Sequence, residues 1–141
     1  VPHLIRDAAH ADSENATRSP VRLGLKIFNA LFDDDFQLEM LKTIHAPGDS
    51  RPDFYIFANR LFDPNREFDG HQGIAYGGPD LSDRNLRVMS RFLRTAEQGD
   101  VISALPWSAT GNIVTGKMAL EYALRGASSF LERHSFPSAC Q

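Results

Sequence analysis

The stretch LSDRNLRVMSRFLRTAEQ, residues 81–98, carries four arginines at spacings of three, four and three residues: Arg84, Arg87, Arg91 and Arg94. On a helix, at about 100° per residue, these side chains share an arc of roughly 80°. The opposite side of the same helix collects apolar residues, namely Leu86, Met89, Leu93 and Ala96. The stretch therefore predicts one amphipathic helix, capped by Ser82, that buries an apolar stripe and exposes a cationic side, here called the arginine face.

The size and composition of the chain indicate one ordinary globular domain. Its 141 residues are 42% hydrophobic and 23% charged, and ten phenylalanines predict an aromatic-rich core. A formal net charge of −3 argues against a general nucleic-acid-binding protein, because such proteins are usually basic overall. No apolar run approaches the ~20 residues that a helix needs to span a membrane.

Two helices are expected before residue 47. Ser19 and Pro20 are a typical helix start, and the residues that follow place apolar side chains on one helical face: Val21, Gly24, Leu25, Phe28, Leu31 and Phe32. Asp33–Asp35 interrupts this pattern, because aspartate favours helix caps over helix interiors. Asp35 would then cap a second helix that runs through Ile44, although one long bent helix fits the same residues.

The segment 53–61 fits two structures. The aromatic run at residues 54–57 suits a buried strand, whereas the spacing of Phe54, Phe57, Ala58 and Leu61 suits a helix capped by Asp53, which we prefer. A last helix is expected from Asn112 or Thr115 to about His134. The fold prediction is therefore all-α: a single compact domain of five or six helices with one long, glycine-rich, structured loop at residues 63–80.

The helical domain is predicted to cover residues 19–134, between an N-terminal arm of residues 1–18 and a C-terminal tail of residues 135–141. The chain begins with Val1 rather than Met, which suggests a processed N-terminus and a secreted or organellar protein. Asn15-Ala16-Thr17 fits the N-glycosylation sequon and agrees with secretion. The single cysteine, Cys140, excludes an internal disulfide.

The arginine face is the main pointer to a function. Guanidinium groups hold carboxylates and phosphates in two-point contacts, and the sequence has no strong catalytic motif. These features predict a non-catalytic interaction module, or a small subunit of a larger assembly such as a virion. It would bind an acidic or phosphorylated protein, or neighbouring subunits, through Arg84, Arg87, Arg91 and Arg94. The alternative is a solvated helix face, and pairing with Asp33–Asp35 of the same chain is one form of it.

The loop DGHQGIAYGGP, residues 69–79, supports a second hypothesis, a small enzyme or ligand-binding protein. Histidine is the usual acid–base side chain in enzymes, so His71 would take that role, with Asp69 orienting it and Tyr76 or an arginine contacting the substrate. The glycines would let a ligand approach the backbone closely. The spacing matches neither the dinucleotide fingerprint nor the phosphate loop, so it identifies no cofactor, and a plain surface loop is the alternative.

Neither the aspartates nor the histidines predict a metal site. Asp33–Asp35 lacks the alternating ligands, central glycine and closing glutamate of a calcium loop, and helix capping explains these residues better. The five histidines are scattered along the chain and no cysteines are paired, so a structural zinc site has little support.

Overall fold

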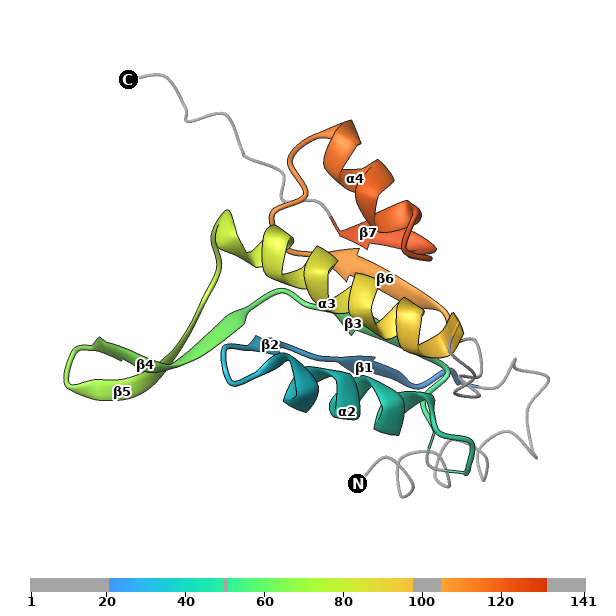
Figure 1. The fold of residues 1–141 in the computed structure, drawn as a ribbon, viewed down its shortest axis with the longest axis horizontal. Helices are drawn as coiled ribbons and strands as arrows, with labels where there is room; N and C mark the ends of the chain where they lie inside the picture. The colour runs from blue at the N-terminus through green and yellow to red at the C-terminus, as the bar shows by residue number, and fades with distance from the viewer. Residues whose placement is uncertain (1–20, 50, 98–104, 132–141) are drawn as a thin grey trace.

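The computed structural model describes residues 21–49, 51–97 and 105–131. These residues form three helices and seven strands: β1 (Gly24–Lys26), β2 (Asn29–Ala30), α2 (Asp34–His45), β3 (Phe54–Phe57), β4 (Leu61–Phe68), β5 (His71–Tyr76), α3 (Asp80–Glu97), β6 (Trp107–Thr110), α4 (Gly116–Ala123) and β7 (Ser129–Leu131). Strands and helices are mixed along the whole described sequence (Figure 1). The fold is therefore α/β, and the all-α prediction is wrong.

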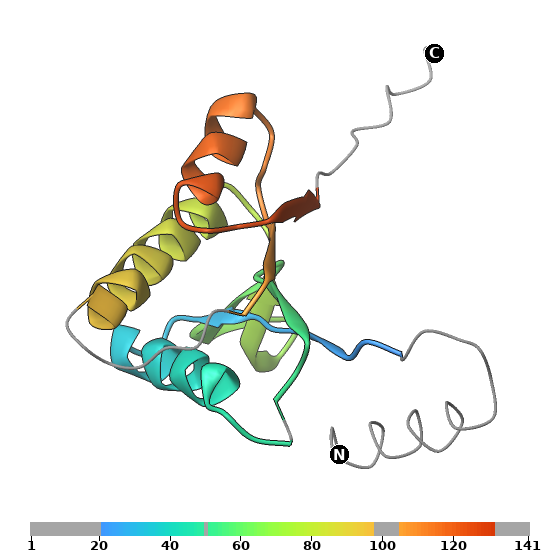
Figure 2. The ribbon, with the colours of Figure 1, turned by 90° about the vertical axis from the view of Figure 1, so that its right-hand side faces the viewer.

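The main sheet has four parallel strands in the order β1-β3-β6-β7. In its register Leu25 aligns with Tyr55, Tyr55 with Trp107, and Ala109 with Phe130. A helix lies in each connection: α2 between β1 and β3, α3 between β3 and β6, and α4 between β6 and β7. Figure 2 shows all three helices on the same face of this sheet.

The strand order explains why the helices share one face. Crossovers between parallel strands are right-handed in nearly all proteins, and here every crossover moves the chain one strand further in the same direction. A doubly wound sheet reverses that direction once and so carries helices on both faces. An order without a reversal is the order of successive units in a (β/α)8 barrel, whose strands follow the sequence around the barrel.

A second sheet, with the strand order β2-β4-β5, continues from the first. β2 follows β1, β4 follows β3, and these two continuations again pair in parallel, with Asn29 opposite Leu61. β5 then folds back on β4 as a hairpin that extends away from the helices (Figure 1). Its turn residues, Asp69 and Gly70, have φ angles of 51° and 74°, and a type I′ hairpin turn requires such positive values.

The hydrophobic core lies between the main sheet and its helices. Tyr55 and Phe57 of β3 and Trp107 of β6 belong to it, and the Tyr55 and Trp107 rings stack with their centroids 6.0 Å apart. The helices close the core with Leu38, Leu41, Ile44, Val88, Met89, Phe92 and Tyr122. The prediction of an aromatic-rich core is thus confirmed within the described residues.

The strands account for the errors in the predicted helices. The residues that follow Pro20 form β1 and β2, and the segment 53–61 contains β3, so the strand interpretation of that segment was the correct one. Parallel strands carry apolar residues on both sheet faces, and they lose the two-residue alternation that identifies a strand. The predicted last helix ends at Ala123 and is followed by β7.

Helices α2 and α3 are confirmed, with small changes at their starts. The cap of α2 is Asp33 rather than Asp35, because the Asp33 carboxylate accepts a hydrogen bond from the Phe36 N–H at 2.7 Å. α3 begins two residues before Ser82, whose hydroxyl donates to the Pro79 carbonyl at 2.9 Å. Both helices thus begin earlier than the sequence pattern indicated.

Several sequence-based expectations lie outside the described residues. They concern the arm at residues 1–18 with its sequon at Asn15, and the tail at residues 135–141 with Cys140. Of the helices that the structure describes, none is both long and apolar enough to cross a membrane.

Two leucines differ strongly in how far they are buried. Leu41 of α2 is fully buried, whereas Leu124, just after α4, is 71% exposed. Leu41→Ala leaves a cavity, so we expect the free energy of unfolding to fall by about 2–5 kcal/mol. Leu124→Ala should change it by less than about 0.5 kcal/mol. Urea denaturation followed by Trp107 fluorescence measures both variants, and equal losses would contradict this core.

Candidate functional site

An open cleft of about 690 Å³ lies at the carboxyl ends of the parallel strands. Lys26, Thr110 and Leu131 are the last residues of β1, β6 and β7, and all three line the cleft. Asn59 and Arg60, which follow β3, line it as well. Parallel strands end at the same edge of a sheet, and this brings residues from distant parts of the sequence together.

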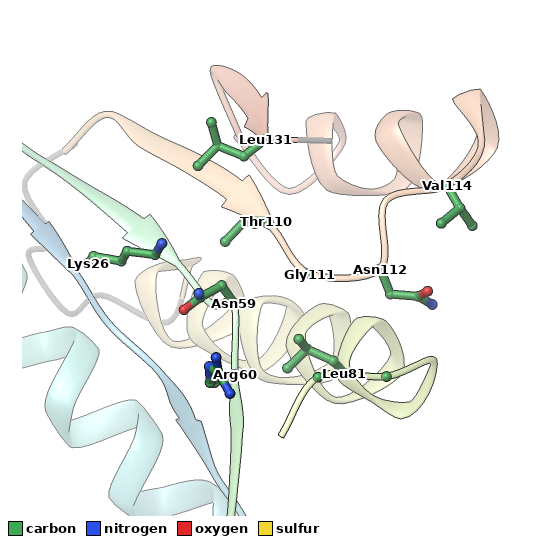
Figure 3. Close-up of a pocket in the computed structure, with 11 residues that line it drawn as sticks. Lys26, Asn59, Arg60, Leu81, Thr110, Gly111, Asn112, Val114 and Leu131 are labelled. Atoms are coloured by element: carbon green, nitrogen blue, oxygen red, sulfur yellow. The ribbon is translucent and has the colours of Figure 1, made fainter. Parts of the chain in front are cut away.

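Two loops form the other wall of the cleft. The loop before α3 contributes Gly77 and Gly78, and the loop after β6 contributes Gly111, Asn112 and Val114; Leu81, in the first turn of α3, lies beside them. Figure 3 shows Lys26, Asn59 and Arg60 on one side of the cleft and the labelled residues of this wall on the other. In open α/β sheets and in (β/α)8 barrels the carboxyl edge is the usual place for a ligand. The cleft is therefore the candidate functional site.

The lining of the cleft is positively charged. Among the described residues that line it, the ionisable side chains are Lys26 and Arg60, and none is a carboxylate. Both cations are exposed. Arg60 is oriented by a hydrogen bond from its Nη1 to the Ala75 carbonyl, at 3.3 Å. A concave surface with charges of one sign concentrates ions of the opposite sign, so this lining attracts anions.

Gly111 sets the shape of the loop that follows β6. Its φ is +98°, and a Cβ there would lie 2.6 Å from the Ala58 carbonyl oxygen and 2.6 Å from the Leu81 side chain. A side chain at this position would strain the backbone and collide with both neighbours. The next residue, Asn112, has a φ of 56° and donates from Nδ2 to the Ser82 hydroxyl at 3.0 Å. The loop is thereby held against the start of α3.

Beneath the cleft, Asn85 of α3 joins the carboxyl ends of two strands. Its Nδ2 lies 3.0 Å from the Ala58 carbonyl oxygen, 3.3 Å from the Thr110 carbonyl oxygen and 3.3 Å from the Tyr122 hydroxyl. Asn85 and Tyr122 are fully buried. A buried amide is stable only when its hydrogen bonds are made, so these contacts fix α3 and α4 against β3 and β6. Burial also raises the pKa of Tyr122, which keeps its hydroxyl protonated.

The hydrogen bonds continue from Asn85 to the start of α2. Asn29 donates from Nδ2 to Asn85 Oδ1 at 2.9 Å, and Arg84 Nε donates to Asn29 Oδ1 at 3.3 Å. Arg84 also donates from Nη2 to the Ala30 carbonyl at 3.0 Å, and its Nη1 contacts the Asp34 carboxylate. We refer to Arg84, Asn29 and Asn85 as the polar network. It links the first turn of α2 to the floor of the cleft.

Asp34 pairs with three arginines of α3. Its carboxylate contacts Arg84, lies 2.8 Å from Arg91 Nη1 and lies 3.6 Å from Arg87 Nη2. Asp35 adds a contact of 3.1 Å to Arg91 Nη2. Burial alone would raise the pKa of Asp34, but the hydrogen bond from Arg91 and the charges of the three arginines outweigh it. The pKa of Asp34 is therefore lowered.

Much of the arginine face is thus an interface between α2 and α3. Arg84 is buried, Arg91 is half-buried, and Arg87 and Arg94 are exposed. Of the predicted apolar stripe, Met89 is buried, whereas Leu86 and Leu93 are half-buried. The buried residues of α3 are Leu81, Ser82, Arg84, Asn85, Val88, Met89 and Phe92. The internal pairing that the sequence offered as an alternative is formed by Asp34 and Asp35.

The residues of the second hypothesis lie in the β4–β5 hairpin. Asp69 is in its turn, His71 begins β5, and both are exposed and outside the lining of the cleft. Tyr76 is half-buried, with the Arg66 guanidinium 4.3 Å from the centre of its ring. The proposed acid–base pair therefore lies outside the cleft. Two glycines of the same loop, at residues 77 and 78, do line the cleft.

Sequence reasoning missed most of the residues in the cleft. Lys26, Asn59 and Arg60 are polar residues that come directly after short apolar runs. This position marks the carboxyl edge of a parallel sheet, but only once the runs have been identified as strands. The sequence pattern makes Asn112 a possible helix start, whereas it lies in the loop between β6 and α4.

Comparison with known proteins adds no functional information. The chain matches no protein-family model, and no curated protein is significantly similar to it. Within residues 21–49, 51–97 and 105–131, no three His, Cys, Asp or Glu side chains lie close enough together to hold a metal ion. The functional argument therefore rests on the geometry of the cleft.

Gly111→Ala should destabilise the protein by about 1–3 kcal/mol, because the new methyl group would force a strained φ and a collision with the Ala58 carbonyl. Gly116→Ala is the matched control, since nothing lies within 4 Å of a Cβ at that position in α4. The control should be neutral or slightly stabilising. Thermal unfolding followed by circular dichroism measures both, and identical melting temperatures would contradict the described loop.

Asp34→Asn should lower the free energy of unfolding by about 1–3 kcal/mol at neutral pH, because Arg84 would keep a buried charge without its charged partner. The folded-state pKa of Asp34 is lowered, so its contribution is complete above the unfolded pKa of about 4 and disappears as the pH falls through the folded pKa. The free energies of unfolding of the wild type and the variant should therefore become equal in acid.

The control for this experiment is Asp35→Asn, because the Asp35 side chain is 82% exposed. An exposed ion pair contributes ~0–1 kcal/mol, so this variant should stay close to wild type. Urea denaturation at several pH values measures all three proteins. A loss for Asp34→Asn that persists unchanged in acid would show that the charge of Asp34 is not what stabilises the interface.

Proposed function

We propose that this chain is a ligand-binding domain that holds a small molecule with a phosphate or carboxylate group in the cleft at the carboxyl edge of its main sheet. One observation carries the proposal. Lys26 and Arg60 converge on a concave site where no carboxylate is present among the described lining residues.

The distribution of charge favours an anionic ligand. The chain as a whole is acidic, with a formal net charge of −3, so the cleft is a local exception. Arg84 and Arg91 of α3 are paired with the carboxylates of Asp34 and Asp35. Lys26 and Arg60, by contrast, form no ion pair with a carboxylate of the described residues. They can therefore bind an anion without breaking an existing ion pair.

Uncharged groups around the two cations complete an anion site. Asn59 and Thr110 offer side-chain hydrogen bonds, and the glycines at residues 77, 78 and 111 leave the backbone accessible. Helix α4 begins next to the cleft, at Gly116, and its first turn has no acidic residue. The positive end of its dipole therefore adds to the field of the cleft.

The size of the cleft favours a small molecule over a macromolecule. Its volume of about 690 Å³ falls in the range of ~300–1,000 Å³ that is typical of small-molecule sites. The cleft is open, and its walls come from the ends of β1, β6 and β7, the segment that follows β3, the first turn of α3 and two loops. Such a site can surround the charged end of a metabolite and leave the remainder accessible.

The earlier hypotheses stay predictions and receive no support from this geometry. Docking of an acidic or phosphorylated protein through the arginine face would compete with Asp34 and Asp35 for Arg84 and Arg91. Acid–base chemistry at His71 would take place on an exposed hairpin, outside any described cavity. We therefore propose binding and assign no catalytic residue.

Isothermal titration with inorganic phosphate, pyrophosphate and citrate tests the proposal, with sodium chloride at matched ionic strength as the reference. We expect at least one of these anions to bind the wild type and to raise its melting temperature. The double variant Lys26→Ala/Arg60→Ala should weaken that binding by about tenfold to a hundredfold, because it loses two charge-assisted contacts.

The matched control is Arg87→Ala/Arg94→Ala, which removes the same charge from exposed positions on α3. This variant should bind the anion as the wild type does, because neither arginine lines the cleft. If the two double variants lose affinity equally, binding depends on overall charge or on the arginine face, and the proposal is wrong. It is equally wrong if none of the three anions binds the wild type.

A further inference from the structure

The face of the main sheet that is opposite to the helices has no cover among the described residues (Figure 2). Parallel sheets are almost always covered on both faces. On β3, Tyr55 and Phe57 belong to the core beneath the helices, so the alternating residues Phe54 and Ile56 face the other side. Both are only half-buried, and they border a groove of about 380 Å³.

Among the described residues, the outer edges of the two end strands of this sheet are also free. In the described part of the chain, β1 and β7 each have one neighbour. The Ser128 N–H donates to the Trp107 carbonyl at 2.9 Å. Successive N–H groups of a strand point to opposite edges, so the Ser129 N–H points to the free edge of β7. A free edge beside an uncovered apolar face favours pairing with a further strand.

We infer that two copies of this chain join edge to edge, with β7 of one copy against β1 of the other, and that their uncovered faces close on each other as an eight-stranded parallel barrel. The strand order of each copy never reverses, and the three helices already lie on what would be the outside. The arrangement of one copy is therefore that of half a (β/α)8 barrel.

The number of strands and the symmetry both favour a second copy as the occupant. Four strands from each copy make eight, the number at which side chains just fill the interior of a barrel. A twofold axis along the barrel forms both β7–β1 pairs at once and leaves no free edge. Because all strands are parallel, the clefts of both copies would open at the same mouth, with Lys26 and Arg60 of each copy around it.

The 38 residues of this sequence that the structure does not describe are too few to supply four further strands of the barrel. These residues are 1–20, 50, 98–104 and 132–141. Four further strands with helical crossovers need roughly 100 residues, since one strand–helix–strand unit takes about 30. A second copy supplies four such strands, each with the required direction, from residues that are already folded.

Sedimentation velocity of the full chain over a wide range of micromolar concentrations tests this inference. We expect a species of twice the monomer mass of 15.7 kDa. Ser129→Pro should raise the dissociation constant about tenfold or more, since it removes the N–H at the free edge of β7. Ser129→Ala is the matched control and should leave the dimer intact, because it keeps this N–H.

A second pair of variants tests the uncovered face. Ile56→Asp places a charge in the proposed barrel interior and should dissociate the dimer. Leu120→Asp places the same charge on α4, where Leu120 is 59% exposed, and should have no effect. Near-ultraviolet circular dichroism reports whether each variant is folded.

Hydrogen exchange of the wild type tests the same edge without a mutation. The Ser129 amide should become protected from exchange as the protein concentration rises.

A dimer that Ser129→Pro and Ile56→Asp weaken, while both controls keep it, supports the inference. A wild type that stays monomeric throughout the concentration range overturns it. The inference is also overturned if Leu120→Asp disrupts the dimer and Ile56→Asp does not, because the dimer interface would then lie on the side of the sheet that carries the helices. If neither test variant folds, the Ser129 amide decides, because exchange that is independent of concentration overturns the inference.

Discussion

Three buried polar side chains, Arg84, Asn29 and Asn85, determine how the helices sit on the main sheet. Apolar surfaces tolerate small shifts, whereas a buried polar group that misses its partner costs about 1–3 kcal/mol. Asn85 reaches the Ala58 and Thr110 carbonyls, and only one position of α3 over β3 and β6 allows both contacts. The apolar core supplies most of the driving force for folding, and the polar network selects the arrangement in which that core is built.

The same network shapes the cleft. The carbonyl of Ala58 is fixed one residue before Asn59, and that of Thr110 is fixed one residue before Gly111, so the lining of the cleft inherits the positions of these two groups. The positively charged residues of α3 and those of the cleft therefore have different roles. Those of α3 hold α2 through Asp34, whereas those at the carboxyl edge of the sheet have no such internal role among the described residues.

The sequence predicted the helices better than the strands, for reasons that particular residues make clear. Apolar and polar residues alternate with helical periodicity along the whole of α3. This pattern predicts the helix and places its arginines on one side, but it does not tell which side faces the protein. Residues 21–32 have helix-like apolar spacing because parallel strands are apolar on both faces. Asp69-Gly70 is a strong hairpin signal, but the histidine and the glycines around it also fit a catalytic loop. The cleft depends on strand order, which local spacing does not encode.

The order of the strands has a consequence for how the chain is made. β1, α2 and β3 lie between residues 24 and 57, and they can pair before the rest of the sequence leaves the ribosome. Contacts between neighbouring segments form quickly, and N-terminal units fold first during synthesis. Asn85 acquires Thr110 and Tyr122 as partners only after the last third of the chain has emerged. A nascent chain therefore lacks two of the four partners of Asn85 until β6 and α4 arrive, and the floor of the cleft is the part that matures last.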